Sequence, residues 1–192
     1  MKLPFLSHFE TMIIGEKIRL REKRLDDIRD DYAWQTDSEL ARLDAAPPLT
    51  TTFVRYLSDY TCNLCAPASI GYHFAIETIE GKHIGNCVVH NVDETKGEAE
   101  LGIMIGNRDY WDKGCGADAV AILVNNIFRE TGLRRIYLKA LDWNKRARKC
   151  FKKCGFTPCG RLVQNGFVFI LMEIHREQWE KRQTETERAL PV

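Results

Sequence analysis

Hydrophobic positions along the chain alternate in some segments and recur every three to four residues in others. Alternation is typical of strands, and the longer period is typical of helices. The pattern predicts a strand, two helices, three strands, a helix, a strand, a helix and two strands. In residue numbers these elements are 13–21, 25–35, a helix beginning near 52, 72–79, 84–92, 98–105, 117–130, 135–141, 144–154, 156–163 and 167–174.

The connections predict how the strands pair. Short polar links at 80–82 and 93–97 predict an antiparallel meander over 72–105, and Asn165-Gly166 predicts a hairpin. The strand, helix, strand passage from 98 to 141 requires a parallel pair. We therefore expect an α/β (α+β) fold with a mixed, mostly antiparallel central sheet. Residues from 177 onward are polar and predict a short helix with a frayed end.

Composition adds few constraints. The 192 residues are 44% hydrophobic and 29% charged, with a net charge of +1, as in ordinary soluble domains. The Lys and Arg residues of 145–153 are interpreted as a solvated surface spread around a helix, so no direct nucleic-acid partner is expected. Residues 1–11 lack the apolar core of a signal peptide, and no apolar run reaches about 18 residues. These features predict a cytoplasmic protein without a membrane partner.

The seven cysteines suggest reduced thiols rather than a disulfide framework. Cys62 and Cys65 have the spacing of half a zinc site, but Cys154 and Cys159 make a poor second pair. No metal is expected.

A glycine pair, Gly114 and Gly116, precedes the amphipathic helix predicted over 117–130. A helix start offers unpaired N–H groups and a positive dipole end, and glycine lets an anion approach the backbone. A simple helix-entry turn is the alternative. The segment is no P-loop, because Ala117-Asp118 follows the glycines, and antiparallel strands precede it, which argues against a dinucleotide site.

Two segments carry a family resemblance. The segment 101–119, which reads LGIMIGNRDYWDKGCGADA, and the segment 144–156, which reads NKRARKCFKKCGF, resemble the motifs of GNAT acetyltransferases, particularly the RimJ/RimL-like and spermidine-acetyltransferase-like branch. The resemblance implies one splayed parallel strand pair and helices on both faces of the sheet. It also implies an acetyltransferase domain over 12–179, between an N-terminal extension (1–11) and a polar C-terminal tail (180–192).

The resemblance further implies acetyl-CoA as co-substrate and assigns its contacts. Backbone groups of the strand would pair with pantetheine, the loop before the helix would wrap the pyrophosphate, and the asparagine of the second motif would order the chain near pantetheine. Two positions depart from the family: Asp112 replaces a common glycine, and Cys115, expected to fill space, replaces a common aromatic residue. The expected contacts are Ile103, Met104, Ile105, Trp111, Asp112, Lys113, Gly114, Cys115, Gly116, Ala117, Asn144 and Phe151.

The sequence offers fewer candidates for catalytic groups than for coenzyme contacts. Glu100 resembles an acidic position that receives the amine proton through water in some family members, although a surface or salt-bridged glutamate is the alternative. Ala147 and Phe151 replace residues that often supply a hydroxyl as the acid. At about 100° per residue, Cys150 is expected to point away from the helix face of Asn144.

The implied activity is direct transfer of acetyl to a primary amine, either a protein N-terminus or a small amine, in a ternary complex. Trp34, Asp37 and Asp44 lie where the family builds its acceptor pocket, although they could instead cap helices or pack the core. His73 and His90 are interpreted as structural. Two alternatives remain: a catalytically impaired acyl-CoA-binding module and a protein-interaction domain that keeps only the fold. The edge strands of the C-terminal hairpin are compatible with a homodimer.

Overall fold

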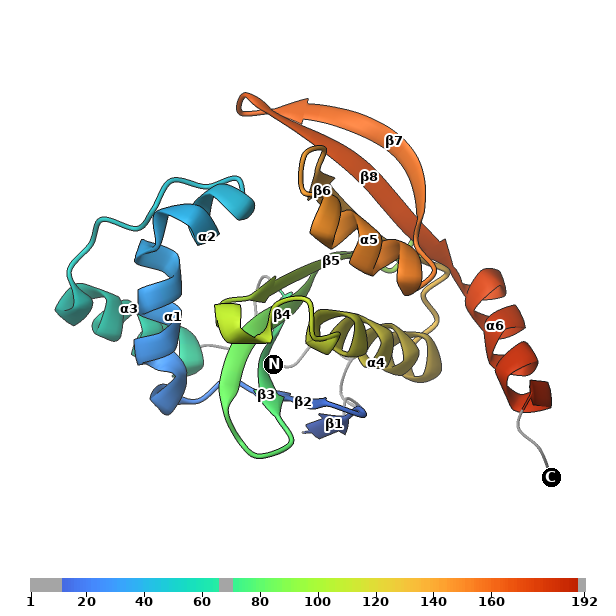
Figure 1. Cartoon of the computed structure of the whole chain (residues 1–192), viewed down its shortest axis with the longest axis horizontal. Coiled ribbons are helices and arrows are strands. Elements are labelled where there is room, and N and C mark those ends of the chain that lie inside the picture. The colour runs from blue at the N-terminus through green and yellow to red at the C-terminus, as the bar shows by residue number, and fades with distance from the viewer. Residues whose placement is uncertain (1–11, 66–70, 190–192) are drawn as a thin grey trace.

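A single eight-stranded sheet organises the protein, as seen in a computed structural model that describes residues 12–65 and 71–189 (Figure 1). The strand order is β1-β2-β3-β4-β5-β6-β8-β7, and every neighbouring pair is antiparallel except β5–β6. The predicted mixed sheet is confirmed. The strands are β1 (Met12–Ile14), β2 (Ile18–Glu22), β3 (Gly71–Thr78), β4 (His83–Asp93), β5 (Glu98–Ile105), β6 (Arg135–Leu141), β7 (Thr157–Gln164) and β8 (Phe167–His175).

Helices cover both faces of this sheet. On one face lies α4, whose long axis crosses the strands beside α5 (Figure 1). On the other face α1 contacts β4, where Asn86 Nδ2 donates to Asp31 Oδ1 at 2.7 Å. The short helix α2 was not predicted, and it begins where Asp37 accepts hydrogen bonds from two backbone N–H groups. The helices are α1 (Ile28–Thr36), α2 (Ser38–Leu43), α3 (Phe53–Cys65), α4 (Cys115–Glu130), α5 (Lys145–Lys153) and α6 (Arg176–Ala189).

The core forms between the sheet and the apolar face of α4. The predicted stripe on that helix is confirmed, because its members are no more than 3% exposed. Each such side chain contributes roughly 1.5–3 kcal/mol through burial. Ala99 and Leu101 of β5 point into the same core, so the intervening Glu100 lies on the opposite face of the strand. The buried α4 side chains are Val120, Leu123, Val124, Ile127 and Phe128.

The predicted strand 13–21 is wrong, because this segment is a hairpin of β1 and β2. The chain reverses where the Gly15 N–H donates to the Ile18 carbonyl at 2.8 Å. The carboxylate of Asp118, in the first turn of α4, accepts hydrogen bonds from the backbone N–H groups of Glu16, Lys17 and Ile18. A partner about one hundred residues away therefore stabilises the turn, and no local pattern reveals it.

The segment 25–35, predicted as one helix, begins as a 3-10 turn at Leu25–Asp27 and becomes α1 only at Ile28. Asp27 causes this entry, because its carboxylate accepts from the Arg24 N–H at 2.8 Å and from both terminal nitrogens of Arg21 on β2. This buried ion pair fastens α1 to the sheet.

The C-terminal helix α6 is longer than the predicted short helix and packs against α4. Arg176 donates to the carbonyls of Phe128, Thr131 and Leu133, which closes the C-terminal end of α4. The expected polar tail begins within this helix at residue 180, while the expected extension 1–11 and residues 190–192 lie outside the described residues. The division into extension, domain and tail stays a prediction.

The other C-terminal feature is β7, an edge strand whose residues are nearly all exposed. It is the strand on which the homodimer hypothesis depends, and that hypothesis stays a prediction.

Candidate functional site

A cleft of about 720 Å³ opens between the end of β5, the start of α4, α5 and α2. This volume is within the range of about 300–1,000 Å³ typical of small-molecule sites. It brings together most of the residues that the sequence predicted. Those that line it are Ile103, Met104, Ile105, Trp111, Asp112, Gly114, Gly116, Ala117, Asn144 and Phe151.

The floor of the cleft forms where β5 and β6 separate. These parallel strands pair only at Glu98–Arg135, Ala99–Ile136 and Glu100–Tyr137. Beyond Glu100, β5 continues to pair with β4 on its other side. The Met104 carbonyl is directed toward β4, so strand alternation directs the backbone groups of Ile103 and Ile105 toward the cleft. The splay therefore leaves hydrogen-bonding backbone groups available to an extended ligand.

The start of α4 forms one wall of the cleft. Its N-cap is Gly114, at φ 86°, which makes no side-chain capping hydrogen bond. This left-handed conformation favours glycine. Lys17 Nζ donates to the Lys113 carbonyl at 2.9 Å, which ties the loop to the β1–β2 turn. The fixed loop, the N–H groups of the first turn and the helix dipole together suit an anion.

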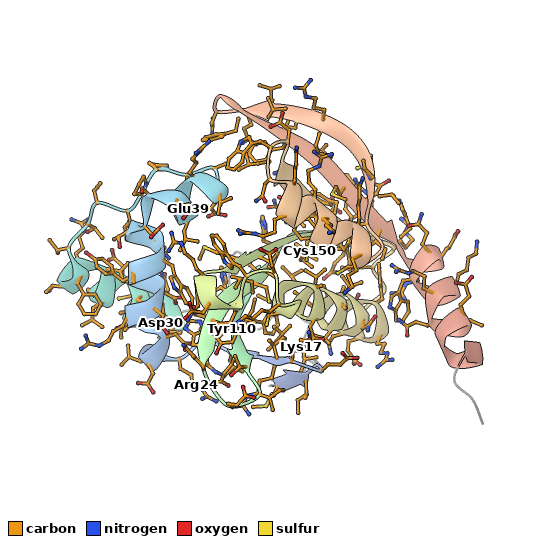
Figure 2. All side chains as sticks on the ribbon, viewed as in Figure 1. Lys17, Arg24, Asp30, Glu39, Tyr110 and Cys150 are labelled. Atoms are coloured by element: carbon orange, nitrogen blue, oxygen red, sulfur yellow. The ribbon has the colours of Figure 1, made fainter. Side chains whose placement is uncertain are left out.

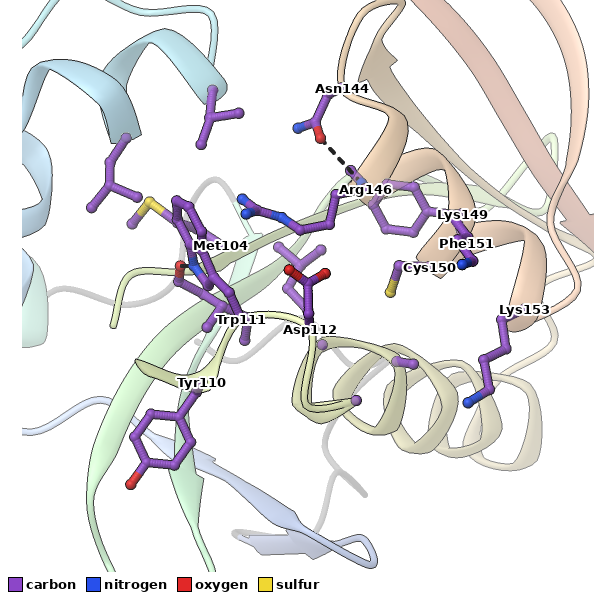
Figure 3. Close-up of a pocket in the computed structure, with 18 of the residues that line it drawn as sticks. Met104, Tyr110, Trp111, Asp112, Asn144, Arg146, Lys149, Cys150, Phe151 and Lys153 are labelled. Carbon is purple, nitrogen blue, oxygen red and sulfur yellow. Dashed lines mark hydrogen bonds between the residues drawn. The ribbon is translucent and has the colours of Figure 1, made fainter. Parts of the chain in front are cut away.

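Basic side chains on α5 form the opposite wall, and the sequence interpretation missed them. Arg146, Lys149 and Lys153 all line the cleft (Figure 3). Their spacing of three and four residues places them on one side of the helix rather than around it. That spacing was the signal available in the sequence. The two walls together make this end of the cleft attractive to a negatively charged ligand.

Trp111 connects these walls. Its indole Nε1 donates to the Ile105 carbonyl at 2.7 Å, and the Arg146 guanidinium lies 3.5 Å from the centre of its ring. Arg108, which is ion-paired with Asp37 and Glu39 beside α2, lies 5.5 Å from the same ring. The indole thereby positions Arg146 over the end of β5.

Three predicted residues do not line the cleft. Cys115 is 5% exposed, and burial raises the pKa of its thiol, as expected of a residue that fills space. The Nζ atom of Lys113 lies 5.7 Å from the ring centre of Tyr110. Glu100 lies on the face of β5 opposite the core, close to the point where β5 and β6 separate.

Glu100 is surrounded by polar side chains on that face, among them Tyr137 of the neighbouring strand β6. It is 6% exposed, and its Oε2 accepts from Asn91 Nδ2 at 2.9 Å. Its Oε1 lies 3.2 Å from Lys139 Nζ and 4.0 Å from His90 Nε2. The structure thus places Glu100 in an ion pair beside the splay, which is the arrangement that the sequence analysis kept as the alternative to a base.

Cys150 was expected to point away from the site, but it lines the cleft beside Ala147. Figure 2 shows it in the space between α4 and α5. Asn144 is the N-cap of α5, where its Oδ1 accepts from the Ala147 N–H at 3.1 Å. The face of α5 that meets the cleft is therefore centred closer to Cys150 than to Asn144. Only the packing of α5 on α4 decides this rotation.

The three proposed acceptor residues separate in the structure. Asp44 lines the cleft at its α2 end, together with Leu40 and Leu43. Asp37 instead caps α2, and Trp34 is buried with its ring 4.7 Å from that of His83.

The two histidines interpreted as structural do not line the cleft. Burial lowers the pKa of His73, and His90 is a neighbour of Glu100.

Within residues 12–65 and 71–189, no group of three or more His, Cys, Asp or Glu side chains is arranged to hold a metal ion. Cys62 is exposed and free, while the side chain of Cys65 lies outside the described residues. In the same part of the chain, no helix has the length and apolar character needed to cross a membrane.

Comparison with known proteins gives a family match. Residues 17–157 match the family model described as an acetyltransferase (GNAT) domain. Among curated proteins, an uncharacterized N-acetyltransferase p20 from Bacillus licheniformis is 26% identical over 148 residues, which are 77% of this chain and 83% of that protein.

Solved structures share the fold. A spermidine N-acetyltransferase from Vibrio cholerae, in complex with CoA and spermine, has a TM-score of 0.75 at 19% identity, covering 85% of this chain and 98% of that one. An aminoglycoside acetyltransferase, AAC(6')-Ib, in complex with coenzyme A has a TM-score of 0.71 at 20% identity, covering 86% and 99%.

Proposed function

Because this chain belongs to the GNAT acetyltransferase family and is an N-acetyltransferase, we propose that it transfers acetyl from acetyl-CoA directly to a primary amine on a protein N-terminus or a small molecule. The observation that carries the proposal is the splay of β5 from β6 directly beside the start of α4. One cleft thus combines backbone groups for an extended amide chain with an anion site.

The chemistry of the cleft fits coenzyme A. Pyrophosphate would meet the N–H groups of the first turn of α4, where Gly114 and Gly116 present no side chain. Arg146, Lys149 and Lys153 supply positive charge across the cleft. The backbone of Ile103 and the N–H group of Ile105 would pair with the pantetheine amides, since the Ile105 carbonyl already accepts from Trp111 Nε1. When bound, acetyl-CoA supplies the acetyl group as an activated thioester.

We propose that the acceptor amine enters from the α2 end. Asp44 supplies a carboxylate there, between the apolar side chains of Leu40 and Leu43, which suits a cationic amine with an apolar neighbour. Two structural relatives carry amine-related names, a spermidine N-acetyltransferase bound to spermine and an aminoglycoside acetyltransferase. Assignment to the RimJ/RimL-like branch is our proposal from the loop motif. A screen for release of free CoA thiol over polyamines, aminoglycosides and N-terminal peptides tests the acceptor class.

Glu100 is our proposed proton acceptor, acting through water from the face of β5 opposite the core. We expect Glu100→Gln to lower kcat about 100-fold or more, the usual range for loss of a general base, while the KM for acetyl-CoA changes little. The change keeps the shape of the side chain and removes its charge. Steady-state kinetics with the best amine from the screen provide the measurement.

Glu98→Gln is the matched control, since Glu98 lies two residues earlier on β5 and pairs with Arg135 at 2.6 Å. We expect it to retain kcat. Equal kcat in Glu100→Gln and the wild-type protein would remove Glu100 from the reaction.

The alternative function, a CoA-binding module without catalysis, has two observations in its favour. Glu100 is ion-paired with Lys139, and Ala147 and Phe151 bring no hydroxyl to the cleft. Tight CoA binding without turnover of any screened amine would favour this alternative.

The Asp112 carboxylate leads to a separate prediction about the affinity for CoA. It occupies a left-handed conformation at φ 57°, and its carboxylate projects into the cleft toward α5 (Figure 3). We expect Asp112→Asn to tighten CoA binding about 3–10-fold, because it removes repulsion from the pyrophosphate while asparagine tolerates this conformation. Isothermal titration calorimetry measures the change.

Asp109→Asn serves as the control for Asp112, because Asp109 is an acid of the same loop that does not line the cleft. Weaker binding by Asp112→Asn would show that the carboxylate assists the ligand instead of repelling it.

A further inference from the structure

Two thiols, on Cys150 of α5 and on its C-cap residue Cys154, face the first turn of α4, and neither has a role in the proposed acetyl transfer. Cys150 lines the cleft, and its sulfur would lie only 3.8 Å from a Cβ placed on Gly116. The sulfur of Cys154, one helical turn later, lies 3.4 Å from the Ala117 carbonyl oxygen. The Cys150 sulfur is therefore directed at the anion end of the cleft.

The surroundings of Cys150 favour its thiolate. A hydrogen bond from Cys154 lowers the pKa of Cys150, burial opposes this effect, and the charge of Lys153 reinforces it. Burial instead raises the pKa of Cys87, Cys115 and Cys159. A half-buried thiol near positive charge, at a helix N-terminus, is the environment of reactive cysteines.

The charge around the pair selects its reaction partner. Arg146, Lys149 and Lys153 line the same cleft, and they raise the local concentration of anions. A small disulfide that carries carboxylates or phosphates is attracted to this wall. A neutral disulfide of similar size is not attracted by these positive charges.

We propose that Cys150, assisted by Cys154, is a thiol–disulfide exchange site for small anionic disulfides, and that its modification closes the coenzyme A end of the cleft. Cys150 loses its proton to solvent, and its thiolate attacks one sulfur of the disulfide. A new bond joins Cys150 to that sulfur while the original sulfur–sulfur bond breaks. The departing thiolate carries away the electron pair.

The bonded group then occupies the space above Gly116. Because the Cys150 sulfur lies beside Gly116 in the cleft, pyrophosphate and a mixed disulfide on Cys150 would compete for one volume. Reduction with dithiothreitol restores the free thiol. This consequence for coenzyme A rests on the proposed function, whereas the exchange reaction does not.

The test is a time course of the full chain with oxidised glutathione, CoA disulfide and neutral hydroxyethyl disulfide, followed by mass spectrometry of digested peptides. With the two anionic disulfides we expect Cys150 to react at least about tenfold faster than exposed Cys62. We expect this preference to shrink with hydroxyethyl disulfide and at high salt. A difference between the two anionic reagents identifies which one the cleft accepts better.

Two variants separate the exchange reaction at Cys150 from its effect on CoA binding. Cys154→Ala is expected to slow exchange at Cys150 several-fold, because it removes the hydrogen bond that favours the thiolate. Cys150→Ser is expected to keep its own untreated level of CoA binding after exposure to oxidised glutathione, while the wild-type protein loses most of its binding until dithiothreitol is added.

The proposal would be overturned if Cys150 exchanged no faster than Cys62. It would also be overturned if oxidised glutathione lowered CoA binding as much in Cys150→Ser as in the wild-type protein. If the untreated protein binds no CoA, the proposed function fails, and the exchange rate at Cys150 alone decides the thiol site.

Discussion

Replacing Asp27 by alanine is expected to lower the free energy of unfolding by about 3–5 kcal/mol, because it removes the carboxylate that binds both terminal nitrogens of the buried Arg21 guanidinium and leaves, among the described residues, only Glu77, 3.3 Å from Arg21 Nε, to pair with it. Arg21 and Asp27 are 4% and 2% exposed, and two hydrogen bonds of 2.9 and 2.7 Å join them. Asp27 also accepts from the Arg24 N–H at the entry to α1. Urea denaturation of the variant and the wild-type protein measures the loss.

Asp30→Ala is the matched control, because the Asp30 side chain is 51% exposed and contacts only His83 among the ion pairs of the described residues. We expect it to cost less than about 1 kcal/mol. A loss below about 1 kcal/mol for Asp27→Ala as well would show that water replaces the carboxylate around Arg21.

The same pair predicts an acid dependence. Burial would raise the pKa of Asp27, but the hydrogen bonds from Arg21 and Arg24 prevail and bring it below its ordinary value. A carboxylate with a lowered pKa in the folded state stabilises the protein above its unfolded pKa of about 4, and this contribution disappears as the pH falls through the folded pKa. Asp27→Ala is expected to lack this component of acid unfolding.

Replacing Gly116 by leucine is expected to weaken CoA binding at least about 100-fold, which corresponds to about 2.7 kcal/mol. A Cβ on Gly116 would lie 3.6 Å from Ile105 Cγ1 and 3.8 Å from Cys150 Sγ, so a larger side chain must extend into the cleft. Leucine favours a helix over glycine by about 0.5–1 kcal/mol. Binding should therefore fall while the free energy of unfolding is maintained, and calorimetry with thermal unfolding measures both.

Gly132→Leu controls for the effect of a leucine elsewhere in the chain. Gly132 follows the other end of α4, and a Cβ added to it would meet no heavy atom of the described residues within 4 Å. CoA binding should therefore stay within about twofold of wild type. Wild-type affinity in Gly116→Leu would place the pyrophosphate away from the start of α4.

Local sequence predicts a feature well when neighbouring residues determine it. The apolar stripe of α4, the strands Glu98–Ile105 and Arg135–Leu141 and the Asn165-Gly166 hairpin all appear as predicted. Each depends on side-chain periodicity or on turn residues. The short helix α2 escaped prediction, because six residues are too few for a periodic signal.

The cleft likewise has parts that local sequence predicts and parts that it does not. Its loop was recognisable from sequence, because glycines before an amphipathic helix and two adjacent family motifs lie within short segments. The spacing of Arg146, Lys149 and Lys153 places them on one side of α5, but spacing alone does not tell which side of α5 packs on α4. Cys150 was misjudged for the same reason, because its direction was measured from Asn144 instead of from the cleft.

By itself the sequence determined the order of most elements, the parallel pair within an antiparallel sheet and the position of the glycine loop before α4. Tertiary structure alone decided the β1–β2 turn held by Asp118, the rotation of α5 and the partners of Glu100. The physical reason is range: backbone conformation responds to side chains a few positions away, whereas a carboxylate or a thiol acquires its role from groups that folding brings near it.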